Sequence, residues 1–189
     1  MGSIFEGHLV RLRGIEPEDW EAFRSFDRHT DDMRNADIVH PPRSAAGYRE
    51  WAQAQALDEG DDTQFRLAVE TLADRTLVGS LSTDGVDQRA GRFAYGIGIG
   101  RDHQRRGYAR DAVVVLLTYM FGERRLHKCE VGVYAVNEPS LALHRALGFR
   151  EEGRLREHEF FAGRRHDLVL MGLTVDEFAE RHPFTTTGP

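Results

Sequence analysis

Residues 103–110, HQRRGYAR, place a glycine between two arginines and an aromatic residue, directly before an apolar segment. Backbone N–H groups at a helix start, together with the helix dipole, bind anions. Gly107 lets the backbone approach a ligand closely, and Arg105 and Arg106 add positive charge. The segment therefore predicts a phosphate-binding loop. Taken by itself, it is equally consistent with an ordinary helix start that carries solvent-exposed arginines.

Other nucleotide-binding patterns do not fit this sequence. It has no G-x-x-x-x-G-K-[ST] motif, and its G-x-G-x-G at Gly96, Gly98 and Gly100 falls within a predicted strand rather than in a turn. Glycine is costly in a strand interior and often marks a bulge or the close approach of a ligand. Kinase-like and dinucleotide-binding functions are therefore disfavoured, and a ligand alongside this strand is expected.

The elements that position the loop are a strand before it and a helix after it. Apolar residues at i, i+3, i+4 and i+7 predict an amphipathic helix over 108–122. Further helices are expected from Glu16, over 44–57 with Ser44 as the N-cap, and over 138–147. Period-two patterns predict strands at 8–12, 65–70, 77–82, 92–100, 128–134, 154–161 and 166–173, with polar connections at 28–42 and 84–91. The expected fold is a mixed α/β sheet with helices packed on it.

Composition limits the class of protein. The 189 residues, 40% of them hydrophobic, predict one domain over 1–189, with a core over about 8–178 and a flexible tail at 183–189. A net charge of -6 disfavours nucleic acid as a partner. Cys129 is the single cysteine, and no apolar run is long enough to cross a membrane. We expect a cytoplasmic protein without a disulfide.

Two separated motifs carry a family resemblance. Gln104 to Ala109 resembles the Q/R-x-x-G-x-G/A pyrophosphate loop of the GNAT acetyltransferases. Residues 137–149, with N-E-P-S at the start and L-G-F at the end, are similar to the family's second signature. Residues 12–13, 18–19, 152–154 and 167 resemble the RimJ/RimL branch, so the resemblance covers roughly 8–178. Two motifs in the right order are more specific than either alone.

The resemblance implies a GNAT fold, with helices on both faces of a mixed sheet and a V-shaped split between two parallel strands, 97–99 and 128–134. Acetyl-CoA would lie in this split, held mainly by the backbone, and no metal is implied. The residues implied to contact it are Ile97, Gly98, Ile99, Gln104, Arg105, Arg106, Gly107, Tyr108, Ala109, Arg110, Asn137 and Ser140.

Acetyl transfer to an amine needs a base and a proton donor. The position at which many GNAT enzymes carry a strand glutamate is Ala94 here. The RimL-like pattern instead points to Glu159, which alternation places on one face with Glu157 and Phe161. The alternative for Glu159 is a surface carboxylate paired with an arginine of the following turn.

Ser140 is the first candidate donor, through a hydroxyl that either caps the helix or reaches the CoA sulfur. His144 stands where many GNAT enzymes carry a tyrosine acid, although a lone helical histidine is more often structural. Asn137 resembles a pantetheine-binding residue and is equally suited to cap the helix. Cys129 is expected to pack as an apolar group, so we predict direct transfer in a ternary complex.

The acceptor is less defined by the sequence. Acidic residues at 31, 32, 37, 58, 59, 61 and 62 suggest a cationic amine, although charge runs are usually solvated surface. RimJ/RimL resemblance points instead to a protein or peptide N-terminus, and homodimerisation is consistent with the family. The alternative function is a non-catalytic acyl-CoA sensor or scaffold, which Ala94 and His144 would favour.

Overall fold

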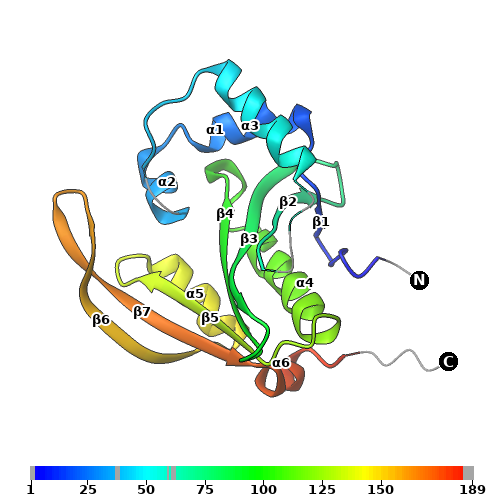
Figure 1. Ribbon diagram of the computed structural model, residues 1–189, viewed down its shortest axis with the longest axis vertical. Helices are drawn as coiled ribbons and strands as arrows, with labels where there is room; N and C mark the ends of the chain where they lie inside the picture. Colours follow the sequence, from blue (N-terminus) through cyan, green and yellow to red (C-terminus); the bar gives the residue numbers. More distant parts are fainter. Residues whose placement is uncertain (1–2, 37–38, 59, 61–62, 185–189) are drawn as a thin grey trace.

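A computed structural model describes residues 3–36, 39–58, 60 and 63–184. Within these residues, one seven-stranded sheet has the order β1-β2-β3-β4-β5-β7-β6 (Figure 1). Its strands are β1 Val10–Arg13, β2 Arg66–Thr71, β3 Leu77–Asp87, β4 Arg92–Ile99, β5 Lys128–Tyr134, β6 Arg150–Phe161 and β7 Arg164–Thr174. The helices are α1 Trp20–Phe26, α2 Thr30–Ala36, α3 Ala45–Leu57, α4 Tyr108–Gly122, α5 Glu138–Leu147 and α6 Val175–Arg181, and 3-10 turns occupy Pro17–Asp19 and Arg101–His103.

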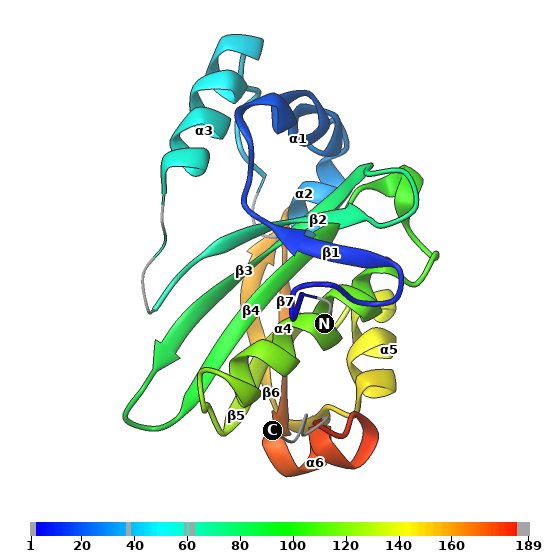
Figure 2. The same cartoon turned by 90° about the vertical axis from the view of Figure 1, so that its right-hand side faces the viewer.

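Helices cover both faces of the sheet, as predicted (Figure 2). The main core lies between the sheet and helices α4 and α5, with Phe93, Leu116 and Leu141 among its buried members. A smaller core on the opposite face joins Phe23 of α1 and Tyr48 of α3 to the sheet. Alternate residues of one strand therefore pack into the two cores, as is usual for a strand that is buried on both faces.

The sheet divides where β4 meets β5, the one parallel pair among its strands. The pairing runs from Arg92–Lys128 to Ala94–Glu130 and then stops. Beyond that point β4 stays paired with β3, and β5 stays paired with β7. The two halves of the sheet thus separate, and the predicted V-shaped split is confirmed.

The structure corrects four element predictions. The stretch 28–42, expected as a polar connection, contains the short helix α2. This helix makes two tertiary contacts: Asp32 pairs with Arg101, and Arg34 lies over the ring of Phe161. Residues 84–87, expected in a turn, continue β3. Strands β6 and β7 begin earlier than expected, at Arg150 and Arg164. The terminal helix α6, capped by Thr174 and Glu177, was missed.

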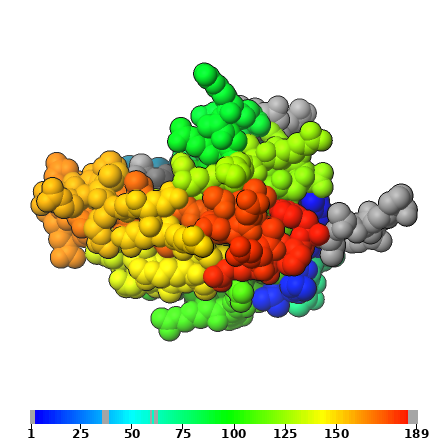
Figure 3. Space-filling model, turned by 90° about the horizontal axis from the view of Figure 1, so that it is seen from below, coloured from blue at the N-terminus to red at the C-terminus, as the bar shows by residue number. Residues whose placement is uncertain are grey.

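Helix α6 begins directly after β7 and seals the end of the main core through Phe178, which is fully buried. Figure 3 shows α6 in the middle of the lower face, beside the yellow and orange residues of α5 and β6. The far end of the predicted tail, 185–189, lies outside the described residues. Among the described helices, none is long and apolar enough to span a membrane.

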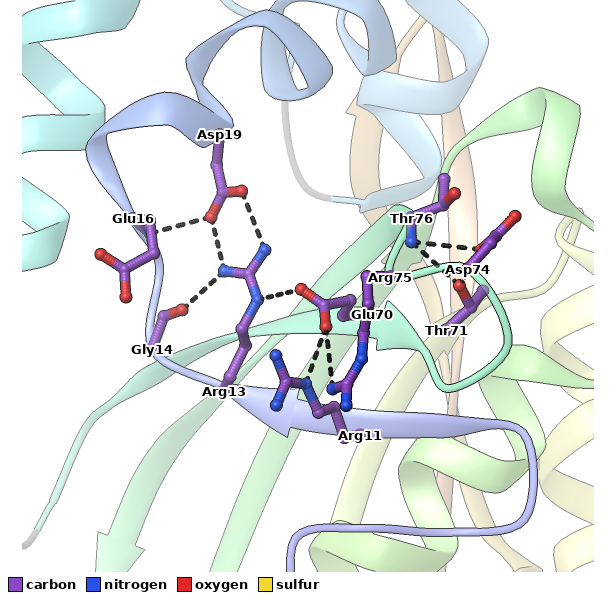
Figure 4. A network of polar contacts seen from close by, with 10 residues as sticks. All are labelled: Arg11, Arg13, Gly14, Glu16, Asp19, Glu70, Thr71, Asp74, Arg75 and Thr76. Atoms are coloured by element: carbon purple, nitrogen blue, oxygen red, sulfur yellow. Dashed lines mark hydrogen bonds and ion pairs between the residues drawn. The ribbon is translucent and has the colours of Figure 1, made fainter.

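A network of ion pairs joins β1, β2 and the 3-10 turn before α1 (Figure 4). Arg13 donates two hydrogen bonds to Asp19, of 2.7 and 2.9 Å, and one of 2.5 Å to Glu70. Arg11 donates to the other oxygen of Glu70 at 2.7 Å, and Arg75 lies 3.5 Å from it. Burial alone would raise the pKa of Glu70, but the hydrogen bonds from Arg13 and Arg11 outweigh it and lower that pKa. The network therefore ties the 3-10 turn that precedes α1 to strands β1 and β2.

Candidate active site

The predicted phosphate loop connects β4 to α4. Gly107 is the N-cap of α4 and has φ of 85°, a conformation that favours glycine. No protein acceptor bonds the six backbone N–H groups of Arg105 to Arg110 in the described structure. Such unpaired N–H groups at a helix N-terminus, reinforced by the helix dipole, form an anion site. The geometry suits a pyrophosphate.

Side chains of the loop serve mainly to shape it. Gln104 was predicted to offer its backbone N–H to the phosphate, but that group donates to the Arg101 carbonyl at 3.3 Å, and its side chain donates to the Ile99 carbonyl at 2.9 Å. Arg106 donates to the Asp102 carbonyl at 3.0 Å. Arg105 and Arg110 are exposed, and neither side chain forms a hydrogen bond or ion pair with a described residue.

Asp111, in the first turn of α4, holds the N-terminal segment against this loop. Its carboxylate accepts backbone hydrogen bonds from His8, Leu9 and Val10, at 3.1, 2.7 and 3.0 Å. A methyl group added at Gly107 would lie 3.1 Å from a methyl carbon of Leu9. This contact was not predicted from the sequence, although acidic residues are favoured in the first turn of a helix.

The second motif forms the N-terminus of α5, on the other side of the split. The side-chain oxygen of Asn137 accepts the backbone N–H of Ser140 at 3.2 Å, so Asn137 is the helix cap. The Ser140 hydroxyl makes no capping bond, and its one protein contact among the described residues is 3.4 Å from Nδ1 of His144. That hydroxyl is therefore the group of this motif that is available to a ligand.

His144 points into the protein. Its Nδ1 lies 2.7 Å from the Ser140 carbonyl, which only accepts, so Nδ1 carries the proton and Nε2 accepts from the Tyr95 hydroxyl at 2.9 Å. Burial lowers the pKa of His144, against a smaller raising effect of the bond to the Ser140 carbonyl. With 3% of its surface exposed, the neutral ring joins α5 to β4. Sequence reasoning missed Tyr95 because a core tyrosine carries no motif.

Cys129 is fully buried on β5, and burial raises the pKa of its thiol well above the usual range. A protonated thiol in the core is a poor nucleophile. The position agrees with the expectation that no acetyl-cysteine forms.

A cavity of about 560 Å³ opens beside the split, on the face covered by α1, α2 and α3. Its floor consists of small residues of β4, with Ala94, Gly96 and Gly98 facing it, and Ile97 and Ile99 also line it. Its wall contains aromatic side chains, including Phe26 of α1 and Trp51 of α3. The glycines of β4 thus leave space above the strand that larger side chains would fill.

The predicted acidic residues are only partly at this cavity. Asp32 lines it, yet its carboxylate is held by Arg101 at 2.9 and 3.1 Å. Asp31 pairs with Arg34 at 2.7 Å and is not among the lining residues. Asp58 lines a separate hollow near Phe65, while residues 37, 59, 61 and 62 lie outside the described part of the chain. Asp27 and Asp84, which the sequence did not single out, also line the cavity.

Glu159 lies on the edge strand β6 near the tip of the β6–β7 hairpin. Its pairing with His166 places it on one face with Phe161, as predicted, but Glu157 has φ of 53° within a bulge, where alternation does not hold. The pairing with Arg164 or Arg165, given as the alternative to a catalytic role, is not observed among the described ion pairs; Glu159 lies 3.7 Å from Nε2 of His158. It is not among the described residues that line the cavity.

The comparison with family models decides the assignment, because the model of the acetyltransferase (GNAT) domain matches residues 10–150. The chain belongs to the GNAT acetyltransferase family. It is 36% identical over 180 residues to the SPbeta prophage-derived N-acetyltransferase YokL of Bacillus subtilis (strain 168). The aligned region covers 95% of this chain and 98% of YokL. A second relative is YdaF of the same strain, whose name describes a provisional ribosomal N-acetyltransferase. The chain is 30% identical to YdaF over 176 residues, which are 89% of this chain and 93% of YdaF.

Solved GNAT structures share the fold. The crystal structure of spermidine N-acetyltransferase from Vibrio cholerae, in complex with CoA and spermine, matches with a TM-score of 0.76 and 25% identity. The match covers 89% of this chain and 97% of that one. Membership of the GNAT family makes this chain an acetyl-CoA-dependent N-acetyltransferase. The unpaired N–H groups at α4 and the split between β4 and β5 fit a CoA thioester.

Proposed function

We propose that this chain acetylates the primary amine of a small cationic acceptor, which binds in the cavity on the face covered by α1, α2 and α3. The observation that carries the proposal is the lining of that cavity, which combines carboxylates with aromatic walls. Asp27 and Asp84 present negative charge, and Phe26 and Trp51 present apolar surface. A molecule with charged nitrogens separated by methylene groups matches this combination.

The charge of Asp27 is held in place by α3. The Tyr48 hydroxyl donates to Asp27 at 2.9 Å, and burial together with this bond raises the pKa of Tyr48 to about 12. Tyr48 therefore stays protonated at neutral pH and can donate its hydroxyl hydrogen to the Asp27 carboxylate. The volume of about 560 Å³ lies within the range of small-molecule sites. The Vibrio cholerae relative was crystallised with spermine, which has the same chemistry.

On the donor side, we propose that acetyl-CoA is held by the backbone of β4 beyond Ala94 and by the N–H groups of Arg105 to Arg110. Bound there, it supplies the acetyl group as a thioester. Arg105 and Arg110 face solvent beside the loop and are suited to the adenosine phosphates. The hydroxyl of Ser140 is suited to donate a hydrogen bond to the sulfur, since it caps nothing. His144 acts as a positioning residue for Ser140 rather than as the acid.

The second candidate acceptor is a peptide N-terminus. Arg43 and Arg66 line the same cavity and would pair with carboxylates of a peptide. YdaF is the relative that favours this acceptor. Self-association also stays a prediction, for which a dodecameric form of the Vibrio cholerae enzyme gives a precedent.

The test is release of free thiol from acetyl-CoA with a panel of acceptors: spermidine, spermine, a monoamine, and peptides with acidic or basic N-terminal sequences. We expect kcat/KM for the polyamines to exceed that for the peptides by at least about tenfold, a difference of about 1.4 kcal/mol. A preference for peptides would contradict the proposal. Tight binding of acetyl-CoA without turnover on any acceptor would favour the sensor function.

A further inference from the structure

Asp84 lies on β3, level with the last pair that β4 and β5 make before the split. It lies directly opposite Ala94 on the neighbouring strand β3. Ala94 in turn pairs with Glu130 of β5. Side chains of directly opposed residues point to the same face of a sheet. Asp84 therefore lies on the cavity face, beside the strand position at which many GNAT enzymes carry a glutamate.

Asp84 differs from every other carboxylate near this point, because no described residue bonds it. Asp27 accepts from Tyr48, and Asp32 accepts from Arg101. Glu130 lies 3.3 Å from Lys128 and 3.7 Å from Arg92. Asp84 lines the cavity and is exposed, and no described residue forms a hydrogen bond or ion pair with it. Its charge is the one that remains available to a ligand.

The backbone directly after Asp84 is irregular. The register between β3 and β4 shifts after the Asp84–Ala94 pair, and Gly85 has φ of 56°. Bulges of this kind bend a strand and reorient side chains, and they are frequent next to active sites. Ser80 and Ser82, on the same face of β3, continue the polar lining away from Asp84.

We propose that Asp84 binds the protonated amine of the acceptor and takes its proton, acting as the base that Ala94 does not provide. This inference rests on the proposed amine acceptor. The nitrogen releases one proton to the Asp84 carboxylate before its lone pair bonds to the acetyl carbon. As the carbon–sulfur bond breaks, the sulfur takes the second proton that the nitrogen loses. Asp84 then returns its proton to solvent.

This assignment competes with Glu159. Both are carboxylates on strands, but Asp84 lines the cavity beside the split, whereas Glu159 lies on the edge strand next to His158. A base must come within hydrogen-bonding reach of the amine or of one bridging water. Among the described residues, Asp84 lines the cavity that we propose for the acceptor, and Glu159 does not.

The experiment compares Asp84→Asn with the wild type and with Glu130→Gln. Glu130 is the matched control because both it and Asp84 pair with Ala94, from the two neighbouring strands, but Glu130 is ion-paired with Lys128 and Arg92. Calorimetry measures spermine binding and acetyl-CoA binding separately, and thiol release measures turnover. We expect Asp84→Asn to weaken spermine binding about tenfold, keep acetyl-CoA binding, and lower kcat roughly a hundredfold, as for loss of a general base. Glu130→Gln should match the wild type in all three.

The pH profile distinguishes a base from a structural residue. Without a base, turnover of Asp84→Asn should recover as pH rises, because more of the amine is already deprotonated. The other ionisable groups lining the cavity are Asp27, Asp32, His40, Arg43, Tyr48, Arg66 and Tyr95. Since histidines titrate near neutral pH, the profile is repeated in a His40→Gln background.

Two results would overturn the inference. One is an active wild type whose Asp84→Asn variant binds spermine and turns over unchanged. The other is a Glu159→Gln variant that loses more turnover than Asp84→Asn while its spermine binding is kept. A wild type that acetylates no amine contradicts the proposed function itself, and spermine binding to Asp84→Asn then still tests the recognition of the amine.

Discussion

The network around Glu70 and the split between β4 and β5 are both rich in polar groups, yet they are built in opposite ways. In the network, Glu70 is 5% exposed and each of its oxygens meets an arginine. At the split, six backbone N–H groups and the Asp84 carboxylate meet no described protein partner. Polar groups that bond one another stabilise the fold, whereas polar groups left without partners are those that a ligand can satisfy.

The comparison predicts that changes in the network cost stability, while changes at the split cost binding. The largest expected effect is that of Glu70→Gln, which removes a buried charge from between Arg11 and Arg13. We expect a loss of about 2 kcal/mol in the free energy of unfolding, since hydrogen bonds to charged groups contribute about 1.5–3 kcal/mol. Urea denaturation measures it, and Asp31→Asn is the control.

Asp31 pairs with Arg34 on the surface, where its side chain is 76% exposed, so its loss should change stability far less. Equal effects of Glu70→Gln and Asp31→Asn would show that the network does not stabilise the fold. Acetyl-CoA affinity of the folded fraction should be unchanged in both.

The same residue gives a prediction for pH. Because the folded state lowers the pKa of Glu70, its contribution is complete above the unfolded pKa of about 4.3 and is lost as pH falls through the folded pKa. Gln cannot titrate. The difference in unfolding free energy between wild type and Glu70→Gln should therefore be constant near pH 7 and shrink below about pH 4. A difference that grows on acidification would contradict this.

At the split, Gly107→Ala should weaken acetyl-CoA binding by roughly tenfold, about 1.4 kcal/mol. The φ of 85° is strained for alanine, and the new methyl would lie 3.1 Å from Leu9, so the loop must shift. Calorimetric titration of acetyl-CoA measures the effect. Gly163→Ala is the matched control, because it has φ of 76° with nothing within 4 Å of the added methyl. Equal losses of affinity in the two variants would remove the specific role of the loop.

The smallest expected effect lies between the two regions, at the buried bond from Tyr95 to His144. Tyr95→Phe removes the donor and leaves Nε2 unpaired, which should cost about 1 kcal/mol of stability. Turnover should fall by less than about threefold, since His144 still contacts Ser140 through Nδ1. Thermal unfolding and thiol release measure the two quantities. A loss of turnover without a loss of stability would instead make His144 part of the proton transfer.

Local patterns in the sequence were sufficient for most elements, for the turn at Gly107 and for the cap at Asn137. The helix at 108–122, the strand at 128–134 and the capped helix at 138–147 were predicted within a residue of their bounds. Gly107 and Asn137 were recognisable because a left-handed turn and a helix cap each restrict the residue type at one position. Helix α2 was missed because Thr30–Ala36 owes its stability to Arg101 and Phe161, far along the chain.

The sequence by itself determined the two family motifs, the glycine turn before α4 and the cap of α5, since each depends on residues close together in the chain. Only the tertiary structure decided which side chains meet. Tyr95 and His144 are 49 positions apart, and Asp84 comes to lie beside Ala94 through the pairing of β3 with β4. Strand register and burial determine whether a carboxylate is bonded within the protein or open to a ligand, and both are properties of the assembled sheet.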